Sequence, residues 1–299
     1  MLTILFDGVA YGMLLFVLAC GLSVTLGLMN FVNLAHGAFA MAGGYVTVVL
    51  VNRAGVPFWL GLVLAFFVTA ALGALLERTL YVHLYARSHL DQVLFTMGLV
   101  FMSVAAVDYV MGSSQQFVRI PAGLQGQFDL FGIGVGRYRL LIIAVCGVVT
   151  LALQLVLVAT RFGIRLRAAV DDQRVARGLG ISVGAVFGIT FAVGSGLAGL
   201  GGALGAEILG LDPIFPLKYM IYFLIVVTVG GTTTITGPFL ASLLLGIGDV
   251  AGKYYGGRDV QIGEFLITIP DVSAFVIYTI MIVVLIWRPR GLFSHATTR

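Results

Sequence analysis

The residues with the clearest chemical potential lie in one stretch of the sequence, residues 27–45. Asn30, Asn33 and His36 follow one another at intervals of three residues, and Gly37 comes directly after the histidine. Residues three apart are neighbours on a helix surface, so this spacing predicts a polar strip on one helical face. The strip could contact a polar solute, or it could hydrogen-bond to neighbouring helices. A zinc site is not indicated, because the stretch has no partner for its histidine at ligand spacing.

A second stretch, 230–238, combines glycines with hydroxyl groups. Its first four positions are Gly230, Gly231, Thr232 and Thr233. The apolar runs on either side, 219–229 and 239–250, are each too short to cross a membrane comfortably. Unwound backbone at membrane depth is tolerated only where it faces protein or a water-filled cavity. We interpret both this stretch and 27–45 as broken segments. Broken segments are the usual pointer to a substrate path in a transporter, so both stretches are candidates for lining one.

Composition places the whole chain in a membrane. Of its 299 residues, 60% are hydrophobic and 10% charged, and the mean hydropathy is +1.08. Soluble domains have about 45–50% apolar and about 25% charged residues. The apolar runs are long and continuous, unlike the ~10-residue alternating segments of a barrel. We therefore predict an all-α polytopic membrane protein that contacts lipid. Its net charge of +4 does not indicate nucleic acid, because Lys and Arg in such proteins report loop orientation.

The apolar runs predict about eight or nine transmembrane segments, some short or broken, in a single domain spanning 1–299. The longest polar connection is 112–139, with a short hairpin expected around 128–136. The segment 161–182 carries five arginines. Because cytoplasmic loops are enriched in Lys and Arg, we assign this segment to the cytoplasm. That assignment puts the N-terminus and 112–139 outside.

The basic segment 161–182 is predicted to form a short amphipathic helix. Asp171 and Asp172 are not a catalytic carboxylate pair, because adjacent residues point about 100° apart on a helix. The small apolar residues on one face would permit close approach of a partner, and the arginines could pair with its acids. The segment is therefore either a solvated loop or a docking surface for a cytoplasmic protein.

The remaining features favour structure over chemistry. Cys20 and Cys146 lie inside apolar runs and are expected to be buried hydrophobes. The glycines of 194–205 stand four apart in places, a spacing that lets membrane helices approach closely. No convergent nucleophile, acid pair or nucleotide-binding loop is present, so we do not expect an enzyme. Five acids near the outer span ends are expected to be interfacial and hydrated: Asp7, Asp108, Glu207, Asp249 and Asp271.

Several separated blocks resemble the permeases of branched-chain amino acid ABC importers, the LivH-like family, which also contains urea and amide permeases. The blocks are 27–45, 160–181, 191–204, 226–237 and 288–292. The resemblance implies the helical bundle of a type II ABC importer in the bacterial cytoplasmic (inner) membrane. It also implies that the chain passes amino acids, branched-chain or similar, as a transport subunit. The family's positions of contact with the ATPase match Gly163, Arg165, Arg167, Ala168, Asp172, Ala176, Gly178 and Gly180.

The resemblance implies partners as well. They are a second homologous, LivM-like permease, two cytoplasmic ATPase subunits and an extracytoplasmic solute-binding protein. ATP and Mg would be bound by the ATPase subunits, so no cofactor is expected in this chain. The family commonly has Glu after the His-Gly pair, where this chain has Ala38, and many relatives have Gly at Thr232. The substrate therefore stays open between amino acids and urea or short amides. An ATP-independent channel or carrier is the further alternative.

Overall fold

The structure is a computed structural model. It describes residues 1–27, 29, 31–85, 87–130, 133–231, 234–256, 259–262, 265–268, 271–289 and 291–292. In chain order the elements are α1 (Leu2–Gly27), α2 (His36–Thr47), the π-helical turn η1 (Val48–Arg53), α3 (Phe58–Thr79), the 3₁₀ turn η2 (Tyr81–His83), α4 (His89–Met111), the 3₁₀ turn η3 (Ala122–Leu124), β1 (Gln127–Leu130), β2 (Ile133–Gly136), α5 (Arg137–Ala159), α6 (Arg161–Asp171), α7 (Gln173–Gly178), α8 (Val183–Gly205), α9 (Phe215–Gly230), α10 (Thr236–Tyr255), β3 (Asp259–Ile262), β4 (Phe265–Thr268) and α11 (Ser273–Trp287).

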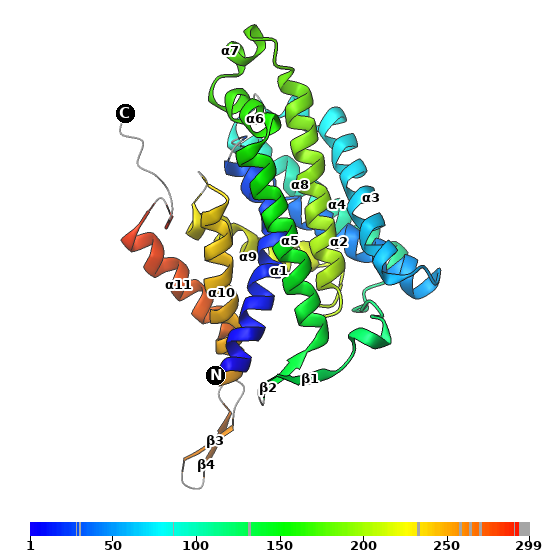
Figure 1. Ribbon diagram of the computed structural model, residues 1–299, viewed down its shortest axis with the longest axis vertical. Helices are drawn as coiled ribbons and strands as arrows, with labels where there is room; N and C mark the ends of the chain where they lie inside the picture. The colour runs from blue at the N-terminus through cyan, green and yellow to red at the C-terminus, as the bar shows by residue number, and fades with distance from the viewer. Residues whose placement is uncertain are drawn as a thin grey trace.

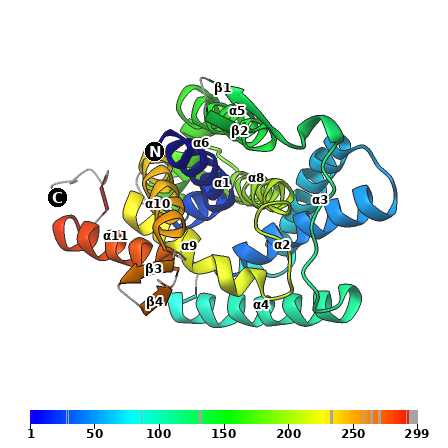
Figure 2. The same cartoon turned by 90° about the horizontal axis from the view of Figure 1, so that it is seen from below.

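Helices α1 and α8 form the centre of the bundle. Helix α8 packs against α1, α2 and α3, and α1 also packs against α10, α5 and α9. Seen from below, α3, α4, α5, α10 and α11 surround this centre (Figure 2). Most of α1 is buried, whereas only a small part of α4 and α5 is buried. An apolar outer ring around a buried centre is the arrangement that hydrocarbon surroundings require.

In the part of the chain that the structure describes, five helices are long and apolar enough to cross a membrane: α1, α3, α4, α5 and α8. Helices α9 and α11 are apolar but shorter. At a rise of about 1.5 Å per residue, each of the five reaches across a hydrocarbon core of about 30 Å. The predicted all-α membrane architecture is thereby confirmed.

The two ends of the bundle differ. Helices α6 and α7 lie at one end, and the N-terminus and both hairpins lie at the other (Figure 1). We call these the α6–α7 end and the hairpin end. The hairpin expected around 128–136 is confirmed as β1–β2, paired from Gln127↔Gly136 to Leu130↔Ile133. A second antiparallel hairpin, β3–β4, lies between α10 and α11.

Glycines let the central helices meet backbone to backbone. A Cβ at Gly202 of α8 would collide with the carbonyl oxygen of Ala40 on α2, and one at Gly43 would collide with Gly199. Gly21 of α1 is equally tight against Gly194. Close approach through small residues replaces the hydrophobic driving force that is absent between helices in lipid. The structural role predicted for the 194–205 glycines is confirmed by these contacts.

Helix α10 is longer than the sequence indicated. The expected run of 239–250 becomes a helix of 20 residues, Thr236–Tyr255. Near its C-terminal end, Lys253 donates to Asp249 at 2.6 Å, one helical turn apart. That pairing neutralises the charge that interrupts the apolar run. The prediction that Asp249 is hydrated is wrong, because the residue is 1% exposed.

Candidate functional site

The chain between α1 and α2 is broken, as its polar residues and glycines indicated. Helix α1 ends at Gly27 and α2 begins at His36, so Asn33 and His36 do not share one helical face and the predicted strip does not form. Asn33 is buried, and its Oδ1 accepts from the backbone N–H of Ala35 at 3.1 Å. This local bond satisfies a donor at the start of α2. Asn30 lies outside the described residues.

His36 ties the start of α2 to the middle of α1. Its Nε2 lies 2.8 Å from the carbonyl oxygen of Leu18, and the ring is buried with its edge toward Phe223 at a centroid distance of 6.2 Å. Its neighbour Gly37 leaves room for Pro216, which a Cβ would approach to 3.0 Å. Between the two alternatives left open by the sequence, this geometry is that of a bond between helices.

We expect His36→Leu to lower the free energy of unfolding by about 1–3 kcal/mol, because a buried hydrogen bond is lost. Thermal unfolding of the detergent-solubilised protein measures the change. His83→Leu is the matched control, since His83 is an exposed histidine in the turn η2 and its loss is expected to be neutral. Equal midpoints for both variants would contradict the structural role of His36.

Two residues of α4 hold the broken segment in place. Gln92 Oε1 accepts from the N–H of Val32 at 3.0 Å, and Thr96 Oγ1 accepts from the N–H of Leu34 at 3.2 Å. Both side chains are buried. They supply partners to backbone groups that have none within a helix. Sequence reasoning missed both, although two polar residues four apart on an otherwise apolar helix were the available signal.

The second break separates α9 from α10. Gly231 ends α9 at φ 89°, a conformation that favours glycine, and Gly230 lies so close to Pro238 that a Cβ would collide with it. The chain's C-terminal part packs on this point: the N–H of Leu292 donates to Val229 O at 2.9 Å. A carbonyl left open at the end of α9 is thereby satisfied. Thr232 and Thr233 lie outside the described residues.

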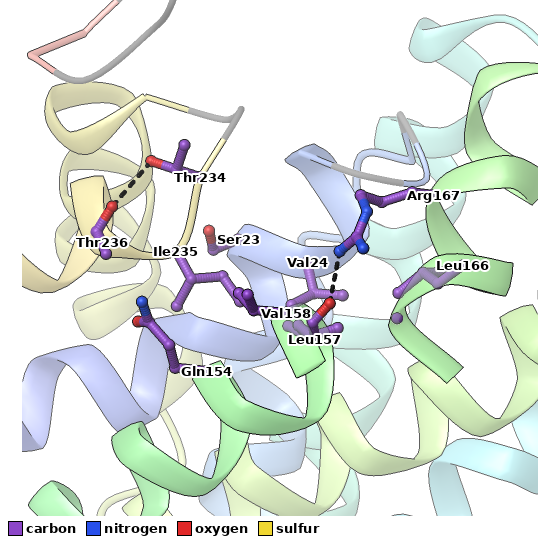
Figure 3. A pocket seen from close by; sticks show the side chains of 11 residues that line it. Ser23, Val24, Gln154, Leu157, Val158, Leu166, Arg167, Thr234, Ile235 and Thr236 are labelled. Atoms are coloured by element: carbon purple, nitrogen blue, oxygen red, sulfur yellow. Dashed lines mark hydrogen bonds between the residues drawn. The ribbon is translucent and has the colours of Figure 1, made fainter. Parts of the chain in front are cut away.

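A cavity of about 250 Å³ lies at the α6–α7 end, beside this second break (Figure 3). Its walls come from α1, α5, α6 and the start of α10. The lining residues are Ser23, Val24, Gln154, Leu157, Val158, Gly163, Leu166, Arg167, Thr234, Ile235 and Thr236. We call it the inner cavity. The polar groups of these described residues are hydroxyls, an amide and a guanidinium, with no carboxylate among them.

Helix α6 closes one side of the inner cavity and is clamped to the end of α5. Gly163 packs so tightly on Leu157 that a Cβ would collide with its carbonyl oxygen. Arg167 donates to the same oxygen at 2.5 Å (Figure 3). A cation at a helix C-terminus meets open carbonyls and the negative end of the helix dipole. Because of this clamp, a displacement of α6 must move the wall of the cavity.

The basic segment forms two helices, where the sequence indicated one. Asp172 is extended (φ −147°, ψ 105°) and caps α7 through Oδ1, which accepts from the N–H groups of Arg174 at 2.7 Å and Val175 at 3.0 Å. Gly180 has φ 80°. The N–H of Ile181 donates to the carbonyl oxygen of Ala176, in α7, at 3.0 Å. This is the helix ending that requires glycine.

The predicted contact residues for a partner divide into two groups. Gly163 and Ala176 are buried against the bundle, and Ala168 is half-buried. The exposed ones are Arg165, Arg167, Asp172, Gly178 and Gly180. Three large apolar side chains lie exposed among them: Ile164, Val175 and Leu179, the last 75% exposed. We call Ile164, Val175, Leu179 and the arginines at 161, 165, 174 and 177 the tip surface. Exposed apolar groups rimmed by polar ones mark interaction sites.

The α6–α7 end is suited to contact with a polar solute. The inner cavity offers hydrogen-bond donors and acceptors beside the second chain break. Within the described ranges, no group of three or more His, Cys, Asp or Glu could hold a metal ion. What the geometry provides is a polar chamber, a helix clamped to its wall, and an apolar and basic surface on that helix and the next.

The sequence matches the family described as branched-chain amino acid transport system / permease component over residues 4–285. A probable branched-chain amino acid transport permease protein LivH of Methanocaldococcus jannaschii is 29% identical, over 91% of this chain and 82% of the relative. The permease protein BraD of a high-affinity branched-chain amino acid transport system in Pseudomonas aeruginosa is 27% identical, over 97% and 95%. The corresponding permease protein LivM of Salmonella typhimurium is 26% identical, over 94% and 68%. No solved structure matches.

Proposed function

Because this chain belongs to the family of permease components of branched-chain amino acid transport systems, we propose that it is driven by separate ATPase subunits that bind its tip surface. The observation that carries the proposal is the pairing of an exposed apolar and basic surface with a clamp onto the inner cavity. Force applied to α6 and α7 reaches the cavity wall through Gly163 and Arg167. A partner that binds differently in two states is what such coupling requires.

The proposed substrate is an amino acid with an aliphatic side chain. The relatives' names refer to branched-chain amino acids, and the described lining of the inner cavity carries hydroxyl, amide and guanidinium groups that can hydrogen-bond to an amino acid. Urea and short amides are disfavoured because none of these relatives is named for them. The similarity to both a LivH and a LivM protein supports a second, homologous permease beside this one. A solute-binding protein would deliver the amino acid at the hairpin end.

We propose nine crossings, with the α6–α7 end in the cytoplasm. The crossings are α1, the segment containing α2, α3, α4, α5, α8, α9, α10 and α11. The exposed arginines of α6 and α7 favour this orientation under the positive-inside rule. The break after α1 and the break after α9 then both face the interior of the bundle, where irregular backbone is tolerated. The substrate path would run past them into the inner cavity.

Purification of the intact assembly tests the ATPase partnership. The protein, tagged and extracted from its native membrane in mild detergent, should bring ATPase subunits with it. Leu179→Glu places a charge in the centre of the tip surface, so we expect at least a tenfold drop in copurified ATPase. Gln173→Glu is the matched control, because it adds the same charge at an exposed polar position of α7, and we expect little change. Unchanged ATPase content in Leu179→Glu would overturn the assignment of the tip surface.

A further inference from the structure

A second cavity, of about 390 Å³, lies at the hairpin end of the bundle. We call it the outer cavity. Helices α1, α5, α9 and α10 and the connection 206–214 contribute to its walls. Its charged lining residues are Asp7, Arg139, Asp249 and Lys253. Its size falls in the range of about 300–1,000 Å³ that is usual for sites of small ligands.

One buried carboxylate in the outer cavity is only half satisfied. Asp249 is 1% exposed, and its Oδ2 accepts from Lys253 Nζ at 2.6 Å. Its Oδ1 forms no hydrogen bond with any described part of the chain, although Ser273 lies close to the same carboxylate. A buried acceptor without a donor costs free energy. An ammonium group bound in the cavity would supply that donor.

Two cations of the outer cavity are available to an anionic group. Lys253 is about half exposed and lies 5.1 Å from the centroid of the Tyr11 ring. Arg139 pairs with Asp7 and keeps 40% of its side chain exposed. A guanidinium has five N–H donors and an ammonium three, so each retains donors beyond its ion pair. The cavity therefore has a carboxylate that needs a donor and cations that retain donors for a carboxylate.

The other residues that line the outer cavity are three tyrosines, Tyr11, Tyr219 and Tyr254, and four aliphatic residues. Ala10, Ile208, Leu209 and Val250 line it together with the charged groups. Aliphatic walls favour an aliphatic ligand group through removal of apolar surface from water. The carboxylate, the cations and the aliphatic wall match, in turn, the ammonium, the carboxylate and the aliphatic side chain of an amino acid.

We propose that the outer cavity binds an α-amino acid with an aliphatic side chain as its zwitterion. The ligand's ammonium donates to Asp249 Oδ1, its carboxylate accepts from Lys253 and Arg139, and its side chain lies against Ile208, Leu209 and Val250. This inference rests on the proposed function and deepens it, because it places a selective site for the substrate in the permease itself.

Binding of radiolabelled leucine to the intact transporter complex tests the proposal. The complex is placed in nanodiscs of phosphatidylglycerol, which offer no lipid ammonium, and the solute-binding protein is left out. We expect saturable binding that 3-methylbutylamine and 4-methylpentanoate compete for at least tenfold more weakly than leucine, since each lacks one charged group. Asp249→Asn should weaken leucine binding at least tenfold. Asp108→Asn, which removes an exposed carboxylate of α4 at the same end, should leave it within twofold.

The outcomes separate this inference from the function beneath it. The outer site would be overturned if the two analogues compete as strongly as leucine does. It would also be overturned if Asp249→Asn binds leucine as tightly as the wild type does. If Asp249→Asn does not assemble, the variant Ile208→Trp is tested instead, because its larger side chain narrows the outer cavity from the connection 206–214. Undiminished leucine binding by Ile208→Trp would also overturn the proposal. ATP-driven leucine uptake by the wild type is measured in parallel. Intact uptake with no such binding rejects the site alone, whereas absent uptake rejects the proposed function.

Discussion

Gly163→Ala is expected to reduce ATP-driven uptake at least tenfold while the permease remains in the membrane. The added methyl collides with the carbonyl oxygen of Leu157, so α6 must move away from the end of α5. The hydrogen bond from Arg167 to the same oxygen is then lost, and motion of α6 no longer reaches the wall of the inner cavity that α5 contributes. Uptake of leucine by cells, normalised to the amount of permease in the membrane, measures the effect.

Gly98→Ala is the matched control for this variant. Gly98 lies in α4, outside the predicted ATPase contacts, and a Cβ there has open space around it. Its uptake should stay within about twofold of wild type, because alanine suits a helix at least as well as glycine. If Gly163→Ala and Gly98→Ala transport equally well, the clamp between α6 and α5 does not carry the coupling.

Gly202→Ala is expected to destabilise the bundle by about 3 kcal/mol or more, at the upper end of overpacking effects. A methyl on Gly202 meets the carbonyl oxygen of Ala40, which belongs to the backbone of α2 and has no freedom to rotate aside. Helices α2 and α8 must therefore separate at the centre of the bundle. The measurement is the unfolding midpoint in detergent, together with the yield of protein in the membrane.

The same helix supplies a control for Gly202→Ala. Gly184, near the start of α8, has nothing within reach of an added Cβ, so Gly184→Ala should change the free energy of unfolding by no more than about 1 kcal/mol. An equally large loss in both variants would mean that α8 tolerates no alanine for reasons other than its contact with α2. No loss in either would contradict the close approach of the two helices.

Hydropathy alone predicted an all-α membrane protein, because a long apolar segment has little choice but to cross as a helix. Leu2–Gly27 is one such helix. Both breaks were also predicted, since glycines and polar residues within apolar runs have few other uses in a membrane. The two-helix form of 161–178 was not, because the capping bonds of Asp172 are a local option that competes with a continuous helix.

Contacts between distant segments could not be read in advance. The bond between His36 and Leu18 and the support of the broken segment by Gln92 depend on which helices become neighbours. Asp249 is a second example. Its nearness to a span end suggested that it is hydrated, yet packing of α1, α9 and α10 buries it. The inner and outer cavities were likewise invisible in the sequence, because residues from four or more segments line each of them.

We propose that this permease moves an amino acid only when ATPase subunits act on α6 and α7. The most direct test is uptake of radiolabelled leucine by proteoliposomes that contain the purified complex, with the solute-binding protein outside and ATP and Mg²⁺ supplied on the side of the tip surface. We predict accumulation above the external concentration with ATP, and none when a non-hydrolysable analogue replaces it. Equilibration of leucine at the same rate without ATP would contradict the account and identify a channel or carrier.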